Sequence, residues 1–268
     1  MTYKQNLHTH TTFCDGKNSP EELITEAIAR DFDSLGFSIH SFMRKQTIAP
    51  ERLSAYKNEI LDLKKKYEKK IDIFLGIEYE PWTEFPAEGF DYSIGAVHYL
   101  LTCDGYRSFD VDREGTLSFI DTYFEGDSMR FAKAYYNTVA ELGDHGKFDI
   151  LAHLDLITKH NEKHPFLDTE CKEYKTLVYE AIDALAGEIP YFELNTGAIS
   201  RGYRSDPYPS AEFLKYLRKK GFGAVITSDC HNKEYLDCFF DGARELLANA
   251  GFTSRFILTN KGFEEIAI

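Results

Sequence analysis

Two histidines separated by one residue, His8 and His10, stand near the start of the sequence, and Asp15 follows five residues later. Successive side chains of a β-strand alternate between its faces, so residues at i and i+2 point the same way. Neutral imidazoles side by side gain little from each other, but they bind a borderline metal ion such as zinc well. The spacing therefore indicates a metal site, although a His-x-His pair on an ordinary strand is the simpler alternative.

The rest of the sequence alternates short apolar segments with amphipathic ones, which indicates strands separated by helices. We predict further strands at 34–40, 71–78, 90–98, 148–154, 189–197 and 222–229, and a last one at 255–259 that adds to the sheet or closes it. We predict helices at 50–70, 128–143, 171–187 and 209–220. Another helix begins after Ser19, a typical N-cap that is followed by Pro20. This order favours an α/β fold, either a (β/α) barrel or a wound parallel sheet.

Residues of metal-binding type stand at or near the carboxyl ends of these predicted strands. They are His8, His10, Asp15, His40, Glu78, His98, His153, Asp229 and His231. In an α/β barrel the loops at that end converge on one mouth, so side chains from different segments should meet there. The other three histidines, His145, His160 and His164, lie in polar, loop-like sequence, and we expect them on the surface.

Six imidazoles and three carboxylates are too many ligands for one ion. A catalytic zinc uses about three protein ligands, so nine candidates suffice for two ions and match three that share a bridging carboxylate, for which Glu78 is the best candidate. Ligands rich in imidazole and poor in thiolate favour zinc, manganese or iron over calcium or magnesium. Cys14 and Cys230 flank predicted ligands, and we interpret both as small buried hydrophobes.

The net charge and the apolar content limit the partners of the chain. Lysines and arginines number 31 against 44 aspartates and glutamates, a net charge of −13, so we expect no binding to nucleic acid. We find no apolar run near the ~18 residues of a membrane span and no signal peptide, so we expect no membrane association. The five cysteines lack C-x-x-C spacing, which favours reduced thiols and a cytoplasmic location. The oligomeric state is not indicated.

The predicted metal group would form a positive site inside this negative chain. Three divalent ions with three carboxylates leave a local charge of about +3, which attracts a phosphate dianion. Clustered metals also generate hydroxide near neutral pH, so hydrolysis of a phosphomonoester is the leading prediction. Arg201 and Arg204 follow the predicted strand at 189–197 and are candidates for binding phosphate, because guanidinium can bind it bidentately. The alternative for each is a solvent-exposed loop arginine.

Taken together, the motifs resemble the polymerase-and-histidinol-phosphatase (PHP) superfamily. The similarity spans essentially the whole chain, in family order: HTH with Asp15, SIH with His40, GIE with Glu78, GAVH with His98, AHLD with His153, and SDCH with Asp229 and His231. The resemblance implies a distorted (β/α)7, TIM-like barrel with the metal site at the C-terminal face of the strands. We expect a single domain over residues 1–268, with 99–146 as a substrate-side insertion.

Carried over position by position, the resemblance implies three ligand groups. They are His8, His10, Glu78 and Asp229; then Glu78, His98 and His153; and then Asp15, His40 and His231. The resemblance also implies that a metal-bridging hydroxide attacks phosphorus while an acidic group, for which we consider Asp15, helps the alkoxide to leave. The predicted catalytic set is Asp15, His40, Glu78 and Asp229.

Within the superfamily, the chain is similar to monofunctional histidinol-phosphatases, in its length and in the segments FDYSIGAVHYL, AHLDLI and ELNTGAISRGYRSDPYPS. This similarity implies hydrolysis of L-histidinol phosphate to L-histidinol and phosphate in histidine biosynthesis. Glu114 and Phe119 are candidates for contacting the ammonium and imidazole of that substrate. The alternatives are a phosphatase for a nucleotide or phosphotyrosine, a nuclease or proofreading module, which the net charge disfavours, and a non-catalytic metal-storage or sensor protein.

Overall fold

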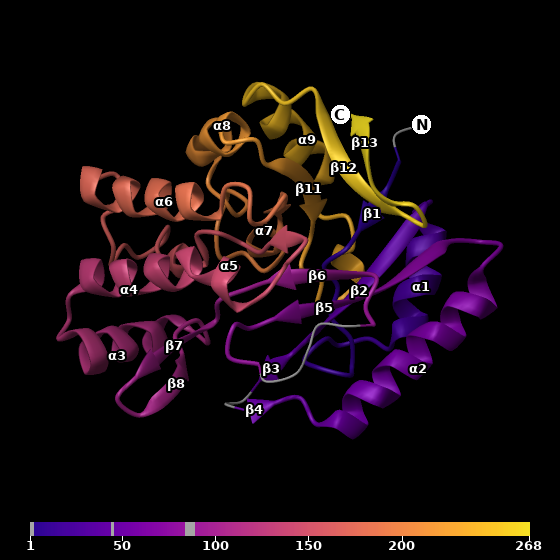
Figure 1. Ribbon diagram of the computed structural model, residues 1–268, viewed down its shortest axis with the longest axis horizontal. Helices are drawn as coiled ribbons and strands as arrows, with labels where there is room; N and C mark the ends of the chain where they lie inside the picture. The colour runs from indigo at the N-terminus through magenta and orange to yellow at the C-terminus, as the bar shows by residue number, and fades with distance from the viewer. Residues whose placement is uncertain (1–2, 44–45, 84–88) are drawn as a thin grey trace.

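A computed structural model describes residues 3–43, 46–83 and 89–268 of the chain. In this described part, seven strands form one parallel sheet whose spatial order follows the order of the sequence (Figure 1). They are β1 (Gln5–Asn6), β2 (Ser34–His40), β5 (Asp72–Tyr79), β6 (Tyr92–Gly95), β9 (Ile150–Leu151), β10 (Tyr191–Asn195) and β11 (Gly223–Thr227). Each new strand is added at the same edge of the sheet, which is how a barrel is built.

The first and last strands of this sheet are joined by the residues that follow them. The Cys230 amide donates to the His8 carbonyl at 3.0 Å, and the His10 amide donates to the Cys230 carbonyl at 2.8 Å. These hydrogen bonds flank a parallel bridge between Thr9 and Cys230. The sheet is therefore a nearly closed barrel of seven strands, and the prediction of a distorted TIM-like barrel is confirmed.

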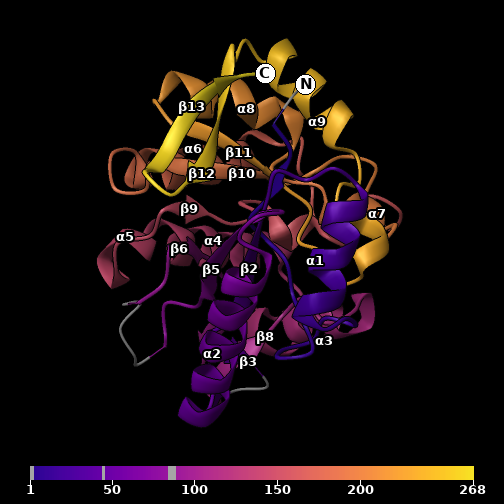
Figure 2. The same ribbon diagram turned by 90° about the vertical axis from the view of Figure 1, so that its right-hand side faces the viewer.

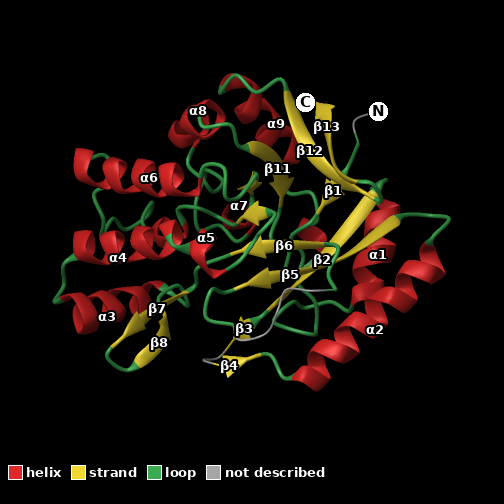
Figure 3. Ribbon diagram, viewed as in Figure 1, coloured by secondary structure: helices red, strands yellow, loops and turns green. Residues whose placement is uncertain are grey.

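Helices surround the barrel and connect its strands (Figure 3). They are α1 (Pro20–Ala29), α2 (Pro50–Tyr67), α3 (Arg113–Phe124), α4 (Ser128–Ala140), α5 (Leu142–His145), α6 (Lys172–Leu185), α7 (Gly197–Ser200), α8 (Ala211–Lys219) and α9 (Phe240–Asn249). As predicted, α1 begins after Ser19, whose hydroxyl accepts from the Glu22 amide while the Glu22 carboxylate accepts from the Ser19 amide. No helix in the described part has the length and apolar character of a membrane span.

A small apolar core fills the inside of the barrel, separate from the larger core between the strands and the helices. Tyr92 is its largest side chain, and its hydroxyl donates to the carbonyl groups of Leu7 and Phe37. Gly36 and Gly76 face this ring so closely that a Cβ at Gly76 would lie 2.2 Å from it. Because these two glycines lack a side chain, Tyr92 can cross the barrel. Its hydrogen bonds connect the segments that lead to His8 and His40.

The predicted strand at 255–259 lies outside the barrel sheet. It forms β12 (Ser254–Thr259), which pairs with β13 (Gly262–Ala267) as an antiparallel hairpin beside β10 and β11 (Figure 2). It neither adds to nor closes the sheet, because β1 and β11 already meet. Leu258 instead packs into the inner core, and the Gln5 side chain makes two hydrogen bonds of 2.8 Å to its backbone.

Residues 99–145 form a hairpin of β7 (Tyr99–Thr102) and β8 (Gly105–Ser108), followed by α3, α4 and α5. In Figure 1, α4 lies between α3 and α6. Phe109, Phe119 and Phe131 pack against one another beneath this hairpin, with ring centroids 5.5 to 6.2 Å apart. A second small hairpin is formed by β3 (Phe42–Met43) and β4 (Gln46–Thr47). The β3–β4 hairpin follows His40 at the end of β2, and the β7–β8 hairpin directly follows His98, so both stand at the mouth of the barrel.

Candidate metal centre

The carboxyl ends of the barrel strands bring the predicted ligands to one place. His40 is the last residue of β2 and pairs in register with Glu78 of β5. His98 follows β6, His153 follows β9, and Asp229 and His231 follow β11. All of these elements are parallel, so their ends open onto the same face.

His8 and His10 lie on one side of the chain, as their spacing predicts. Their ring centroids are 5.0 Å apart, and both side chains are buried. Thr9, between them, points the other way and donates to the Gly36 carbonyl. The regular strand ends already at Asn6, but the bridge between Thr9 and Cys230 keeps this segment extended and holds the two imidazoles in place.

Glu78 is the centre of the cluster. Its side chain is 1% exposed, and five imidazoles surround its carboxylate. The nitrogen–oxygen distances are 3.4 Å to His8, 3.4 Å to His10, 2.8 Å to His40, 3.4 Å to His98 and 3.1 Å to His153. Most of these are longer than a good hydrogen bond, so the carboxylate is shared among ligands rather than paired with one of them.

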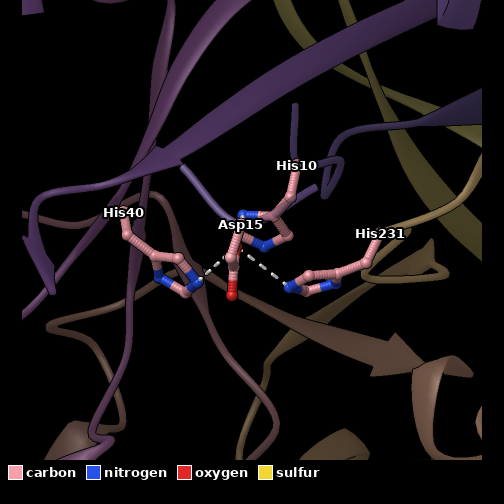
Figure 4. Close-up of side chains that lie close together, drawn as sticks. All are labelled: His10, Asp15, His40 and His231. Atoms are coloured by element: carbon pink, nitrogen blue, oxygen red, sulfur yellow. Dashed lines mark ion pairs between the residues drawn. The ribbon is translucent and has the colours of Figure 1, made fainter. Parts of the chain in front are cut away.

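Asp15 lies between His40 and His231 (Figure 4). One carboxylate oxygen lies 3.5 Å from His40 Nε2, 3.3 Å from His231 Nε2 and 3.9 Å from His10 Nδ1. The Asp15 side chain is 46% exposed, in contrast to the buried Glu78. It therefore faces the cavity from which a substrate would enter.

Asp229 closes the cluster from the β11 side. Its carboxylate lies 3.3 Å from His10 and 3.7 Å from His8. The residue adopts a left-handed backbone conformation with φ of 46°, which is uncommon for a residue other than glycine and concentrates at functional sites. Asp229 lies two residues after the end of β11 at Thr227, and this conformation turns its carboxylate toward the imidazoles of His8 and His10.

Three sets of these side chains could each hold a metal ion, because their ligand atoms lie within 4.8 Å of one another. They are His10, Asp15, His40 and His231; His8, His10 and Asp229; and His40, Glu78 and His98. Each resembles one of the three groups implied by the sequence, except that His10 and His40 are each shared between two sets. His153 joins the third set through its 3.1 Å contact with Glu78. The structure thus brings all nine predicted ligands together.

The ligand atoms of this cluster are suited to bind cations. His8 Nε2, His10 Nε2 and one Glu78 oxygen are buried without any hydrogen-bond partner, which is costly unless a ligand satisfies them. Burial and the nearby His231 and His40 lower the pKa of His10 to about 3, so the ring is neutral, as a metal ligand must be. Although burial opposes it, the imidazoles around Glu78 hold the pKa of that carboxyl well below its usual value.

Two buried glutamates, which were not predicted from the sequence, contact the Nδ1 atoms of His98 and His8. Glu80 accepts hydrogen bonds from His98 Nδ1 and from the His98 amide. Glu193 lies 2.8 Å from His8 Nδ1 and accepts from the His153 amide at 2.8 Å. Such carboxylates fix the orientation of metal-binding imidazoles. The spacing of Glu80, two residues after Glu78 and directly after the end of β5, was the available signal. Glu193 lies inside β10 and had none.

The two arginines predicted to bind phosphate have different surroundings. Arg201 reaches the cluster, where it donates to the Asp229 carboxylate at 2.8 Å and to the Asp229 carbonyl at 2.9 Å. Its Nε is buried and has no partner. Arg204 is instead buried beside Asp155, and the guanidinium donates to Thr158 and Ser210 at 2.7 Å. A phosphate contact of Arg204 remains a prediction from sequence, and the structure gives its side chain other partners.

A cavity of about 380 Å³ opens above the cluster. It is lined by Asp15, Lys17, His40, Phe42, His98, Tyr99, Ser108, Asp110, Leu156, Lys159, Arg201, Tyr203, Asp229 and His231. Neither Glu114 nor Phe119 is among these residues: Glu114 is exposed on α3, and Phe119 is buried among other aromatic rings. A contact of Glu114 or Phe119 with the substrate stays a prediction from sequence, and the structure places both side chains away from this cavity.

The remaining histidines and the two neighbouring cysteines lie outside the three ligand sets. His145 and His164 are exposed as predicted, whereas His160 is partly buried with its ring 5.0 Å from that of Tyr203. Cys14 Sγ lies 3.4 Å from His10 Nδ1, and burial raises the pKa of its thiol. Burial also raises the pKa of Cys230 to about 12, and its thiol donates to the Asn232 carbonyl. Both thiols are therefore protonated at neutral pH.

The barrel and its histidine- and carboxylate-rich mouth define a class of protein. The chain belongs to the PHP domain family, whose model matches residues 6–197. Among solved structures, it is similar to a proposed histidinol phosphatase, HisK, from Listeria monocytogenes, with a TM-score of 0.75, 20% identity, and coverage of 89% of this chain and 99% of that one.

A second similar structure is the histidinol phosphate phosphatase HisK from Lactococcus lactis subsp. lactis, complexed with zinc, L-histidinol and phosphate. Its TM-score is 0.74 at 20% identity, and the alignment covers 97% of this chain and 98% of that one. No curated protein shows a significant sequence match to this chain. At this identity, the two structures support the fold over nearly the whole chain.

Proposed function

We propose that this protein is a metal-dependent phosphomonoesterase that hydrolyses L-histidinol phosphate to L-histidinol and phosphate. The observation that carries the proposal is the cluster of nine ligand side chains at the floor of an open cavity, with buried ligand atoms that have no protein partner. The cluster provides places for up to three divalent ions. The donor chemistry suits zinc, manganese or iron.

The polar side chains of the cavity suit a phosphate group. Arg201, Lys17 and Lys159 line it together with the cluster, so three cationic side chains face the same space. Metal ions held by the cluster would acidify a water molecule and offset the charge of the phosphoryl group. The unpartnered Nε of Arg201 is a donor that a phosphate oxygen could take.

Asp15 is the candidate for moving the proton. Although burial alone would raise the pKa of Asp15, hydrogen bonds and charges of His231 and His40 lower it, so the resting side chain is a carboxylate. It can therefore accept a proton from the attacking water and then deliver it to the departing alkoxide. Its position on the open side of the cluster gives it access to both.

The choice of L-histidinol phosphate rests on the similar structures. Both are described as histidinol phosphatases, and the one from Lactococcus lactis holds zinc, L-histidinol and phosphate together. The shared fold and the shared PHP family make the same substrate the first to test. A nucleotide and a phosphotyrosine peptide are the alternatives with the same chemistry.

Steady-state phosphate release by the purified protein tests the proposal. We expect kcat/KM for L-histidinol phosphate to exceed that for p-nitrophenyl phosphate by about 100-fold, because binding of the non-reacting part of the substrate lowers the barrier. AMP and a phosphotyrosine peptide should resemble p-nitrophenyl phosphate. Equal values for all four would disprove the substrate, and elemental analysis of the same sample would show which metals are bound.

A further inference from the structure

The side chains that line the cavity above the metal centre differ in chemistry. Arg201 and Lys17 are cations suited to phosphate. Phe42, Tyr99 and Asp110 belong to the two hairpins at the mouth and their flanking residues. Among the carboxylates that line the described cavity, Asp15 and Asp229 belong to the metal-binding sets, and Asp110 does not.

Asp110 is held in place but keeps acceptor capacity. One carboxylate oxygen accepts from the Ser108 hydroxyl at 2.9 Å, and the other lies 3.3 Å from Lys159 Nζ. Lys159 makes its shorter bond, 2.7 Å, to the Asp110 carbonyl instead. An ionised carboxylate has about four acceptor positions, so at least one further donor can bind. The side chain is 17% exposed and lines the cavity.

Asp110 carries a full negative charge at neutral pH. Burial alone would raise the pKa of Asp110, but Lys159, His98 and the Ser108 hydroxyl together lower it to about 2. The charge of Lys159 is already shared between Asp110 and the ring of Tyr203, which lies 5.1 Å from its Nζ. Asp110 is thus a negative side chain outside the metal-binding sets in a cavity that Lys17 and Arg201 also line.

Phe42 and Tyr99 add an apolar wall to the lining of the cavity. Phe42 and Tyr99 are 7% and 8% exposed, and their rings meet edge to face with centroids 5.0 Å apart. Tyr106 supports Phe42 from behind, and Trp82 stacks on Tyr106 with centroids 4.6 Å apart. Aromatic rings held in this way accept another flat ring or an alkyl chain without rearranging.

We infer that Asp110, with the wall of Phe42 and Tyr99, is the subsite for the leaving group of the substrate, and that it selects phosphomonoesters whose leaving group carries an ammonium. This inference rests on the proposed phosphatase function and assigns the recognition of the organic part of the substrate. The ammonium donates to the free acceptor position of Asp110, and the body of the leaving group lies against the two rings. The phosphate group of the same substrate then lies over the metal centre.

A matched pair of small substrates tests the inference without using L-histidinol phosphate. O-phosphoethanolamine carries an ammonium, and ethyl phosphate has the same two-carbon leaving group without it. For the wild-type protein we expect kcat/KM to be about 10- to 100-fold higher for O-phosphoethanolamine, the usual range for a hydrogen bond to a charged group. A ratio near one would overturn the inference.

Substitution of Asp110 assigns the preference to this side chain. In Asp110→Asn the ratio of the two kcat/KM values should fall to about one, because the amide cannot neutralise an ammonium. Asp112→Asn is the matched control: Asp112 is exposed, does not line the cavity, and caps α3 through a hydrogen bond to the Gly115 amide that asparagine can also accept. It should keep the wild-type ratio. A preserved ratio in Asp110→Asn would exclude Asp110.

The outcomes separate this inference from the proposed function. A preference for O-phosphoethanolamine that depends on Asp110, without efficient hydrolysis of L-histidinol phosphate, would support the subsite and reject the proposed substrate. Efficient hydrolysis of L-histidinol phosphate with equal activity in wild type and Asp110→Asn would support the proposed substrate and reject the subsite. Should Asp110→Asn fail to fold, Asp110→Ser is the second variant, and its ratio should likewise fall to about one, whereas a preserved ratio would exclude Asp110.

Discussion

The candidate metal centre and the polar network around Arg204 are neighbours, since His153 of the first and Asp155 of the second are two residues apart. In the network, one carboxylate meets one guanidinium: Asp155 accepts from Arg204, and Arg204 donates to Thr158 and Ser210. In the candidate metal centre, carboxylates meet mainly imidazoles, and His8 Nε2, His10 Nε2 and one Glu78 oxygen have no partner. Asp155 thus has a guanidinium beside it, whereas Glu78 is surrounded by imidazoles alone.

This contrast shows how buried charge distinguishes a structural role from a functional one. The network pairs its opposite charges, with Asp155 fully buried, Arg204 8% exposed and the Tyr208 ring 4.6 Å from the guanidinium, although Asp155 Oδ1 and the Tyr208 hydroxyl have no hydrogen-bond partner. Such a pair holds segments together, because removing one partner leaves the other charged and alone. A cluster of imidazoles and carboxylates that opens onto a cavity is instead suited to bind a ligand.

Removal of the central carboxylate of the metal centre should have the largest effect. Glu78→Gln keeps the shape of the side chain but loses the charge shared by five imidazoles, so we expect loss of bound metal and a fall in kcat on the order of 1000-fold or more. Elemental analysis and phosphate release measure both. Glu59→Gln, an exposed glutamate of α2, is the control and should behave as wild type. Full metal content and activity in Glu78→Gln would contradict the assignment.

Removal of the cation from the network should mainly affect stability. Arg204→Met leaves Asp155 buried without its partner, and we expect the free energy of unfolding to fall by about 3 to 5 kcal/mol. Urea titration measures this change, and kcat/KM of the folded protein should stay close to that of wild type. Unchanged stability with a raised KM would show instead that Arg204 binds phosphate, as its sequence position suggested.

Substitution of Glu193, which contacts His8 but belongs to none of the three ligand sets, tests whether the surrounding carboxylates affect metal affinity. Glu193→Gln retains the volume of the side chain but weakens its bond to His8 Nδ1, and we expect metal affinity to fall about 10- to 100-fold. Competition with a chelator of known affinity measures this directly. Glu188→Gln, on the exposed turn before β10, should keep the wild-type affinity. Equal affinities in the two variants would limit Glu193 to a packing role.

Asp110 provides an intermediate case, a partly exposed carboxylate beside Lys159. Its pKa in the folded protein is about 2, below the ordinary 3.8, so its charge stabilises the native state above about pH 4 and this contribution is lost as the pH falls through 2. We expect Asp110→Asn to be less stable than wild type by about 1 to 2 kcal/mol at neutral pH. The difference in unfolding free energy should disappear on acidification, and a constant difference would contradict the charge argument.

The fold was largely predictable because most strands of a parallel barrel are buried on both faces and so appear as continuous apolar runs. β1 is the exception. Its two residues, Gln5 and Asn6, are polar but fully enclosed, and their side chains bind Ser34, Leu258 and Ser228. Hydropathy cannot indicate such a strand. Only the histidines that follow it showed that an extended segment was needed.

The site was predictable where a residue type stood at the end of a strand, and less so elsewhere. Histidines and acids at strand ends share one mouth by geometry alone, so their clustering could be expected without coordinates. Glu193 and Asp110 contact segments distant in sequence, and only the folded structure brings those segments together. An aromatic residue such as Phe119 in a loop-rich segment can serve a core or a ligand equally well, and the structure packs it against Phe109 and Phe131.

The seam between Thr9 and Cys230 joins segments that are far apart in the sequence. His8 and His10 flank one side of this bridge, and Asp229 and His231 flank the other. Any local unfolding that separates the two segments would therefore disperse four of the nine clustered side chains at once.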